Sequence, residues 1–269
     1  MVDNNEYNND KKNFPYFELV IGINPVLLLL KRNAGRRKIF EIYIDEAKEN
    51  DFRLKEILDI AEQKNIKVLV LTKKDFKKIL KDDELKSQGV CARVSNYSYL
   101  DLDNYLKKDV KKNSRLIILD KITDIGNFGG IIRNCLAFNF DGIVIPKHDS
   151  VYVNKDVSRI SAGALEATNI FRVSNLFETI KKLKSNNFWI YCSCLGNLNN
   201  LQQIDEIKFS FPLALILGSE HKGASRLLRE NSDVLVYIKI NNIIDSLNVS
   251  VASGIMLYEI SKQASDNFM

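Results

Sequence analysis

The sequence lacks the residues and patterns on which several classes of protein depend. Its 269 residues include only two histidines and four cysteines. The cysteines form no CxxC pair and have no histidine nearby in the chain, so the pattern predicts no zinc site and no other metal site. The most conspicuous apolar run covers only Pro25 to Leu30, which is far too short to cross a bilayer. A P-loop and a GxGxxG fingerprint are also missing, which argues against a nucleotide-binding α/β enzyme of those types.

Charge of one sign is not in large excess either. The chain has 39 Lys and Arg against 34 Asp and Glu, a net charge of +5, which permits binding to nucleic acid without requiring it. A surface for RNA must therefore come from local clustering. Residues 1–15 are rich in Asn and Asp and lack the apolar run of a signal peptide, so we expect a disordered tail there. The cysteine pattern predicts reduced thiols in a cytoplasmic protein, and the short apolar run predicts no membrane partner.

Residues 16–95 alternate compact apolar segments with amphipathic ones, which is typical of a small α/β domain. The expected strands are Ile39–Ile44, Ile66–Leu71 and Gly89–Val94, and the expected helices are Pro25–Arg32, Leu54–Lys64 and Lys73–Leu80. The polar segment 96–114, which ends in several lysines, is predicted to be a linker.

Basic residues crowd a short loop around Gly35, and Arg32, Arg36 and Arg37 are the arginines among them. A solvated loop beside a helix C-terminus explains such a cluster from the sequence alone, because cations are favourable there. Contact with phosphate becomes the better interpretation once an RNA substrate is accepted.

Residues 115–269 form a second α/β series, in which strands and helices alternate to the end of the chain. The expected strands are Leu116–Leu119, Gly142–Ile145, Ile170–Val173, Phe188–Cys192, Leu213–Leu217 and Val234–Ile238, and the expected helices are Gly129–Phe138, Leu176–Ser185 and Val249–Lys262. This pattern predicts an open parallel sheet whose ligand binds at the carboxyl ends of the strands.

Three stretches of this second series carry polar residues directly after a strand. The first, DKITDIGNFGGIIR, places Asn127 in the loop after its strand and Arg133 about two turns into the next helix. The second, PLALILGSEHKG, ends an apolar strand at Gly218, and such a turn leaves backbone N–H groups free to face a polar ligand. The third, VLVYIKINNIIDSLN, joins a strand to the last helix through Ser246, Leu247 and Asn248.

Together, in this order and at this spacing, the three stretches resemble the motifs of the SpoU family of RNA ribose 2′-O-methyltransferases in the SPOUT superfamily. The members that methylate a guanosine of large-subunit (23S) ribosomal RNA are the most similar. The resemblance implies a small ribosomal-protein-like α/β domain that docks RNA, followed by a SPOUT α/β catalytic domain with a trefoil knot, in a homodimer. The chain departs from the usual motifs at Ile125, Asn139, Lys239 and Asn242, where the family has Pro, Gly, Pro and Gly.

The resemblance also implies roles for particular residues. S-adenosylmethionine (AdoMet) would be bound by Leu217, Gly218, Ile238, Ile240 and Leu247, and the reacting centre would be surrounded by Asn127, Arg133, Glu220, Ser246 and Asn248. The pKa of a guanidinium lies above 12, which makes Arg133 an expensive general base. We therefore expect Arg133 to bind the target phosphate and to polarise the hydroxyl.

Two alternatives remain open at this stage. One is a ribose methyltransferase that acts on transfer RNA. The other is a catalytically inactive RNA-binding protein of ribosome assembly that keeps the fold.

Overall fold

The computed structural model describes residues 17–80, 87–194, 200–219, 223–241 and 243–264. The chain forms two compact units. Unit 1 comprises residues up to Ser98 together with Val153–Ala167, and unit 2 comprises Tyr99–Tyr152 and the chain from Thr168 onward. The predicted tail and Glu220 lie outside the described residues. No helix among the described residues is both long and apolar enough to span a membrane.

Unit 1 is a four-stranded sheet of order β1-β4-β2-β3, in which only the β2–β3 pair is parallel. Its strands are β1 (Phe17–Ile21), β2 (Ile39–Asp45), β3 (Lys67–Leu71) and β4 (Val90–Ser95), and its helices are α2 (Ile23–Arg32), α3 (Lys55–Gln63), α4 (Lys73–Leu80) and α7 (Lys155–Ile160). Helices α2 and α3 pack with Ile42 and Ile44 on one face, whereas α4 packs with Tyr43 on the other.

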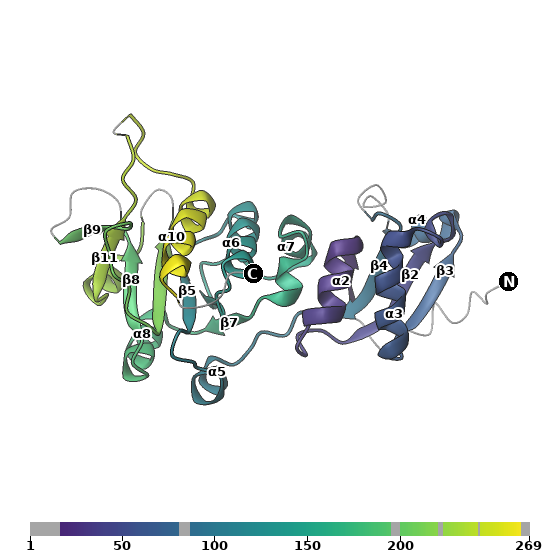
Figure 1. The fold of residues 1–269 in the computed structure, drawn as a ribbon, viewed down its shortest axis with the longest axis horizontal. Helices are drawn as coiled ribbons and strands as arrows, with labels where there is room; N and C mark the ends of the chain where they lie inside the picture. The colour runs from purple at the N-terminus through teal and green to yellow at the C-terminus, as the bar shows by residue number, and fades with distance from the viewer. Residues whose placement is uncertain (1–16, 81–86, 195–199, 220–222, 242, 265–269) are drawn as a thin grey trace. The chain divides into compact units, whose positions relative to one another are not determined.

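Unit 2 is a seven-stranded parallel sheet of order β7-β6-β5-β10-β8-β11-β9 (Figure 1). Its strands are β5 (Arg115–Asp120), β6 (Gly142–Pro146), β7 (Ile170–Val173), β8 (Trp189–Ser193), β9 (Leu201–Gln203), β10 (Leu213–Gly218) and β11 (Val234–Tyr237). Its helices are α5 (Leu102–Lys108), α6 (Ile125–Ala137), α8 (Leu176–Ser185), α9 (Arg226–Glu230) and α10 (Val249–Gln263). The predicted α/β class with a parallel sheet is confirmed.

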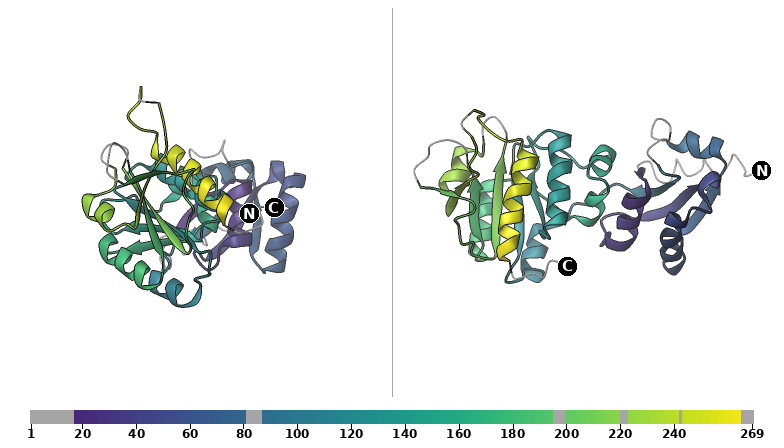
Figure 2. Two further views of the ribbon diagram at one scale, coloured as in Figure 1. Left: turned by 60° about the vertical axis from the view of Figure 1, so that its left-hand side comes forward. Right: turned by 45° about the horizontal axis from the view of Figure 1, so that its top comes forward.

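The helices of unit 2 form two layers, one on each face of the sheet. Side chains of the central strands alternate between the two faces and pack against both layers. Leu116 and Ile118 of β5 share a buried cluster with side chains of α5, α8 and α9. Ile117 and Leu119 point to the opposite face. There α6 and α10 lie side by side (Figures 1 and 2). Loops at the carboxyl ends of the strands are thus framed by helices of both layers.

Three local predictions differ from the structure. The segment 96–114 is not a plain linker, because α5 begins after its N-cap Asp101 and buries Leu102, Tyr105 and Leu106 in the core of unit 2. Residues Val153–Ala167 belong with unit 1, although the sequence places them inside the second series. Helix α6 begins at Ile125, four residues before the predicted start.

Candidate functional site

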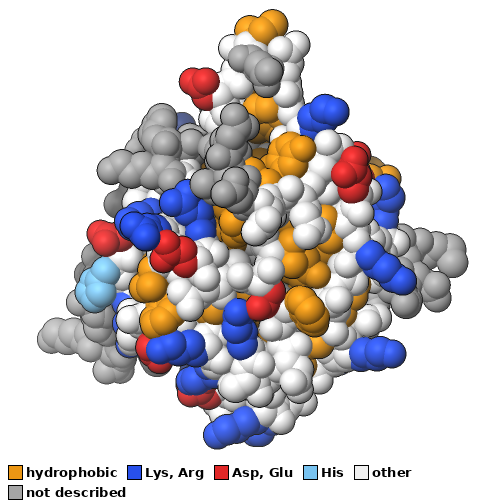
Figure 3. Space-filling view, turned by 90° about the vertical axis from the view of Figure 1, so that its left-hand side faces the viewer, with side chains coloured by type: hydrophobic (Ala, Val, Ile, Leu, Met, Phe, Trp, Pro, Cys, Tyr) orange, Lys and Arg blue, Asp and Glu red, His pale blue; other side chains and the backbone are white. Residues whose placement is uncertain are grey.

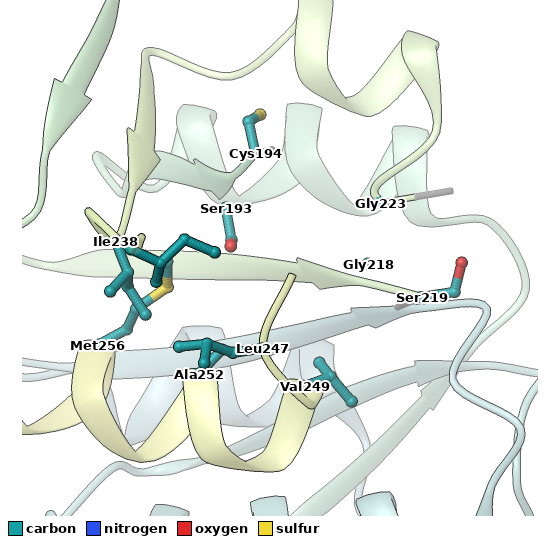
Figure 4. A pocket seen from close by; sticks show the side chains of 11 residues that line it. Ser193, Cys194, Gly218, Ser219, Gly223, Ile238, Leu247, Val249, Ala252 and Met256 are labelled. Carbon is teal, nitrogen blue, oxygen red and sulfur yellow. The ribbon is translucent and has the colours of Figure 1, made fainter. Parts of the chain in front are cut away.

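A pocket opens where β10 and β11 end and α10 begins (Figure 4). Its cavity volume is about 50 Å³. Gly218, Ile238, Ile240 and Leu247, four of the five residues predicted to bind the cofactor, line it. The fifth, Leu217, is fully buried within β10 and does not line the pocket. The structure therefore brings together residues from two strand ends and the segment before α10.

The wall at Gly218 is very close to the loop that follows it. A Cβ atom at this position would lie 1.9 Å from the backbone nitrogen of Ala224 and 2.0 Å from the carbonyl carbon of Gly223. The N–H of Gly223 donates to the carbonyl of Ser219 over 2.7 Å, and Gly223 has a φ of +63°. Only glycine at position 218 leaves room for this return of the chain.

A buried carboxylate fixes the other end of the same loop. Asp120, which stands opposite Gly218 in the register of β5 and β10, is 5% exposed. Its Oδ2 accepts a hydrogen bond from the backbone N–H of Ser225 at 2.6 Å. A charge-assisted hydrogen bond of this length is among the stronger kinds in proteins, so Asp120 anchors the loop that forms the pocket wall.

Asn127 and Asn248 meet at the starts of α6 and α10. The Nδ2 of Asn248 donates to Oδ1 of Asn127 over 2.7 Å. Asn248 is also the N-cap of α10, because its Oδ1 accepts the N–H of Ser250 at 3.0 Å. The prediction that Asn127 lies in a loop is wrong, since Asp124 caps α6 by accepting the N–H of Asn127 at 2.7 Å, which places Asn127 in the first helical turn.

Helices α6 and α10 are joined by two further contacts that the sequence did not reveal. Asn134 donates through Nδ2 to the carbonyl of Ser250 and to Oγ of Ser253, both at 2.8 Å. A Cβ atom at Gly130 would lie 2.8 Å from Cβ of Ser250, so glycine permits the close approach. Asn127, Gly130 and Asn134 recur at helical spacing, and this spacing is the signal that could have identified Asn134.

None of the predicted catalytic residues in the described part of the chain lines the pocket. Arg133 is exposed on α6 and makes no hydrogen bond or ion pair with the residues that the structure describes. Ser246 is half-buried beside Leu247 and does not line the pocket.

Several pocket residues were missed by sequence reasoning. They come from the end of β8, the residue after β10 and the first turns of α10: Ser193, Cys194, Ser219, Val249, Ala252 and Met256. The side chain of Ser193 points toward α10 and that of Cys194 points away from it (Figure 4). The sequence around Ser193 predicts a buried strand and gives no sign of a site. Ser193 lies at the pocket because its strand, β8, pairs with β10.

Two of the three arginines predicted to contact RNA are buried inside unit 1. Arg37 donates from Nε to Oε2 of Glu166 and from Nη1 to Oε2 of Glu18, both at 2.8 Å. Arg36 donates to the carbonyls of Arg32 and Asn33, and burial lowers the pKa of its guanidinium. The prediction of an exposed basic loop is therefore wrong for Arg36 and Arg37, since segment 153–167 of unit 1 covers them. Arg32 is exposed.

Among the described residues, no group of three or more His, Cys, Asp or Glu side chains is arranged to hold a metal ion. The polar groups in and beside the pocket are instead amides, hydroxyls and backbone groups.

Comparisons with known proteins agree over most of the chain. Residues 114–258 match the model of the SpoU rRNA Methylase family, and residues 19–100 match the model for RNA 2′-O ribose methyltransferase substrate binding. YacO of Bacillus subtilis, assigned to the TrmH family of tRNA/rRNA methyltransferases, is 31% identical over 248 residues, which cover 91% of this chain and 96% of that protein. A Staphylococcus aureus protein with the same assignment is 37% identical over 66% of this chain and 72% of its own length.

Solved structures show the same fold. The SpoU methyltransferase AviRb from Streptomyces viridochromogenes, crystallised in complex with the cofactor AdoMet, aligns with a TM-score of 0.73 at 21% identity and covers 95% of this chain and 92% of its own. An AdoMet-bound rRNA methyltransferase from Sinorhizobium meliloti aligns with a TM-score of 0.72 at 20% identity over 96% of this chain and 92% of its own.

Proposed function

Because the chain belongs to the SpoU family of RNA methyltransferases, we propose that it methylates a ribose 2′-hydroxyl of RNA with AdoMet as the methyl donor. The favoured substrate is a guanosine in large-subunit ribosomal RNA. The observation that carries the proposal is the pocket at Gly218, Ile238 and Leu247, with the Asn127–Asn248 pair at the adjoining helix starts. The four cysteines of the chain are free and buried, which supports the proposal of a cytoplasmic protein.

The pocket residues fit AdoMet. Ile238, Leu247 and Met256 offer apolar surface for an adenine ring, and the tight turn at Gly218 brings backbone groups within reach of the polar parts of the cofactor. When bound, AdoMet supplies an electrophilic methyl group on a sulfonium. Lys239, which replaces a proline of the motif, lies between Ile238 and Ile240, so the chain keeps apolar side chains at both flanking positions.

The residues of this chain then have to position the ribose and handle its hydroxyl proton. Exposed Arg133 is available to bind the phosphate of the target nucleotide and to polarise its 2′-hydroxyl. Asn127 and Asn248 fix the starts of α6 and α10, and thereby fix the helix that carries Arg133 relative to the cofactor pocket. We assign Glu220 and Ser246 to the same reacting centre on the strength of the motifs.

We also propose a trefoil knot and a homodimer. The strand order supports the knot, since β10 lies between β5 and β8 while α10 returns to pack on α6. Support for the dimer comes from Val251, Ile255 and Tyr258, which form a stripe on α10 and are 53%, 37% and 51% exposed. Figure 3 shows hydrophobic side chains reaching the surface on one side of the molecule, from the projecting tip downward. Such apolar surface is typical of an interface between subunits.

RNA docking on unit 1 is part of the proposal. The support is the match of residues 19–100 to a substrate-binding model and the exposed Arg32 at the end of α2. Arg36 and Arg37 are not included, because their guanidinium groups are buried in the unit.

The test is methyl transfer to RNA from cells that lack the protein. Purified protein and labelled AdoMet are incubated separately with ribosomal RNA and with transfer RNA, and the methylated nucleotide is mapped. Label in a ribose of ribosomal RNA supports the proposal, and label only in transfer RNA selects the first alternative. A substrate carrying one 2′-deoxy nucleotide at the mapped position should bind and accept no methyl group. AdoMet binding without transfer to either RNA would favour the inactive assembly factor.

A further inference from the structure

A second cavity of about 400 Å³ lies at the carboxyl edge of the parallel sheet in unit 2. It is lined by the ends of β5 and β6, by the residues that follow them, and by the first turns of α8 and α9. Helices α8 and α9 belong to the layer opposite α10, so this cavity and the cofactor pocket open at one edge of the sheet but on different faces. Cavities at the carboxyl edge of a parallel sheet are the usual places for ligands.

One loop connects the two sites. Gly223 lines the cofactor pocket, and Ser225, two residues later, lines the second cavity. Consecutive Cα atoms lie about 3.8 Å apart, so the two positions are separated by less than about 8 Å. Asp120 holds Ser225 in place through its 2.6 Å hydrogen bond. An RNA strand whose ribose lies at the cofactor pocket therefore has a neighbouring nucleotide within reach of the second cavity.

The chemistry of the cavity combines an apolar wall with a polar rim. Leu176 and Leu228 are 8% and 3% exposed and form the inner wall, whereas Leu227 is 50% exposed at the opening. A half-exposed leucine at the mouth of a cavity offers apolar surface to the flat face of a ligand ring. An RNA base presents such a flat surface when it is unstacked and turned away from its strand.

The rim carries groups for a phosphate and for the edge of a base. Lys121 and His148 are exposed there, as is Asp149. The Oδ2 of the other acidic residue, Asp120, is already engaged by Ser225, which leaves Asp149 as the carboxylate able to accept from an exocyclic amino group. Lys121 and Asp149 have φ of +59° and +55°, a backbone conformation that is uncommon outside glycine.

We propose that this cavity binds an unpaired nucleotide of the substrate RNA next to the nucleotide that is methylated. The base contacts the wall at Leu227, the phosphate lies near Lys121 and His148, and Asp149 accepts from the base edge. This inference rests on the proposed function, because the ligand is the strand whose ribose is methylated.

The test compares Leu227→Asp with the wild type in methyl transfer to ribosomal RNA from cells that lack the protein. Placing a carboxylate on the wall should raise the KM for RNA about tenfold or more, which corresponds to the loss of one base contact. The Kd for AdoMet should not change, because Leu227 does not line the cofactor pocket. Trp189→Asp is the matched control, because Trp189 is 46% exposed at the opposite, amino edge of the sheet and should leave both constants unchanged.

A second variant keeps the inference testable if Leu227→Asp does not fold. Lys121→Gln should weaken RNA binding and reduce the slope of log affinity against log salt by about one. An unchanged KM for RNA in a folded Leu227→Asp protein, or an unchanged salt slope in Lys121→Gln, overturns the inference. Failure of the wild type to methylate any RNA would instead overturn the proposed function.

Discussion

Replacing Arg37 with Met should destabilise unit 1 strongly, because it leaves the buried carboxylate of Glu166 without its cationic partner. The side chains of Arg37 and Glu166 are both 0% exposed, and their Nε and Oε2 atoms are 2.8 Å apart. Without Arg37, the carboxylate of Glu166 keeps the hydroxyl of Ser158 as a hydrogen-bond donor, which donates to Oε1 at 2.8 Å. Glu18, the second partner of Arg37, is 22% exposed and regains water more easily. Breaking a buried ion pair from one side costs about 3–5 kcal/mol.

This loss is large enough to measure by thermal unfolding. In a domain of roughly 100 residues, 1 kcal/mol shifts the midpoint by about 4–8 °C, so Arg37→Met should lower the midpoint of unit 1 by more than about 12 °C. Replacing both partners, in Arg37→Met with Glu166→Gln, should recover most of the loss, because no buried charge is left without a partner.

The pH dependence follows from Glu166. Burial raises the pKa of its carboxyl above the usual 4.5, and Arg37 opposes that rise. A folded-state pKa above the unfolded value means that the folded protein holds the proton more tightly. Stability from this group is therefore fully present below about pH 4.5 and is lost as the pH rises through the folded-state pKa. Removing Arg37 enlarges the effect, so the variant should lose more stability than the wild type between pH 5 and pH 8.

The assay is circular dichroism or fluorescence unfolding of wild type, single variant and double variant at both pH values. Arg53→Met is the control, since the Arg53–Asp51 pair lies at the surface and its loss should leave the midpoint nearly unchanged. A free energy of unfolding for Arg37→Met within about 1 kcal/mol of the wild type would contradict this prediction, as would a double variant no more stable than the single one.

Three further predictions concern the cofactor, the reaction and the proposed dimer. Gly218→Ala should weaken AdoMet binding by about tenfold or more in calorimetry, because the new methyl group would lie 1.9 Å from the nitrogen of Ala224 and the loop must open; an unchanged Kd would show that the turn is not needed. Arg133→Ala should abolish methyl transfer and leave AdoMet affinity largely intact, and near-normal turnover would remove Arg133 from the reaction. Val251→Asp combined with Tyr258→Asp should give a monomer in light scattering, since charges would replace the exposed stripe of α10; a dimer that persists would place the interface elsewhere.

Local sequence patterns were sufficient to predict the secondary structure and the class of the fold. Two-residue and 3.6-residue periodicities depend only on neighbouring residues, and they predicted helix Lys73–Leu80 and strand Ile170–Val173 with the bounds that the structure has. The parallel sheet followed from the alternation of such elements. Motif residues such as Gly218 and Leu247, which line the pocket at the end of β10, were predicted to lie together because the motifs keep their order and spacing.

Which distant residues meet, and which charges are buried, depends on how the elements pack together. Arg37 reads as a solvated residue of a basic loop, and it is buried because segment 153–167, more than 100 residues away in sequence, covers it. Asp120 meets Ser225, and Asn127 meets Asn248, because parallel strands from separate parts of the chain end at one edge of the sheet. Periodicity and capping act within a few residues, whereas these contacts depend on how the whole chain is threaded, and no local pattern carries that information.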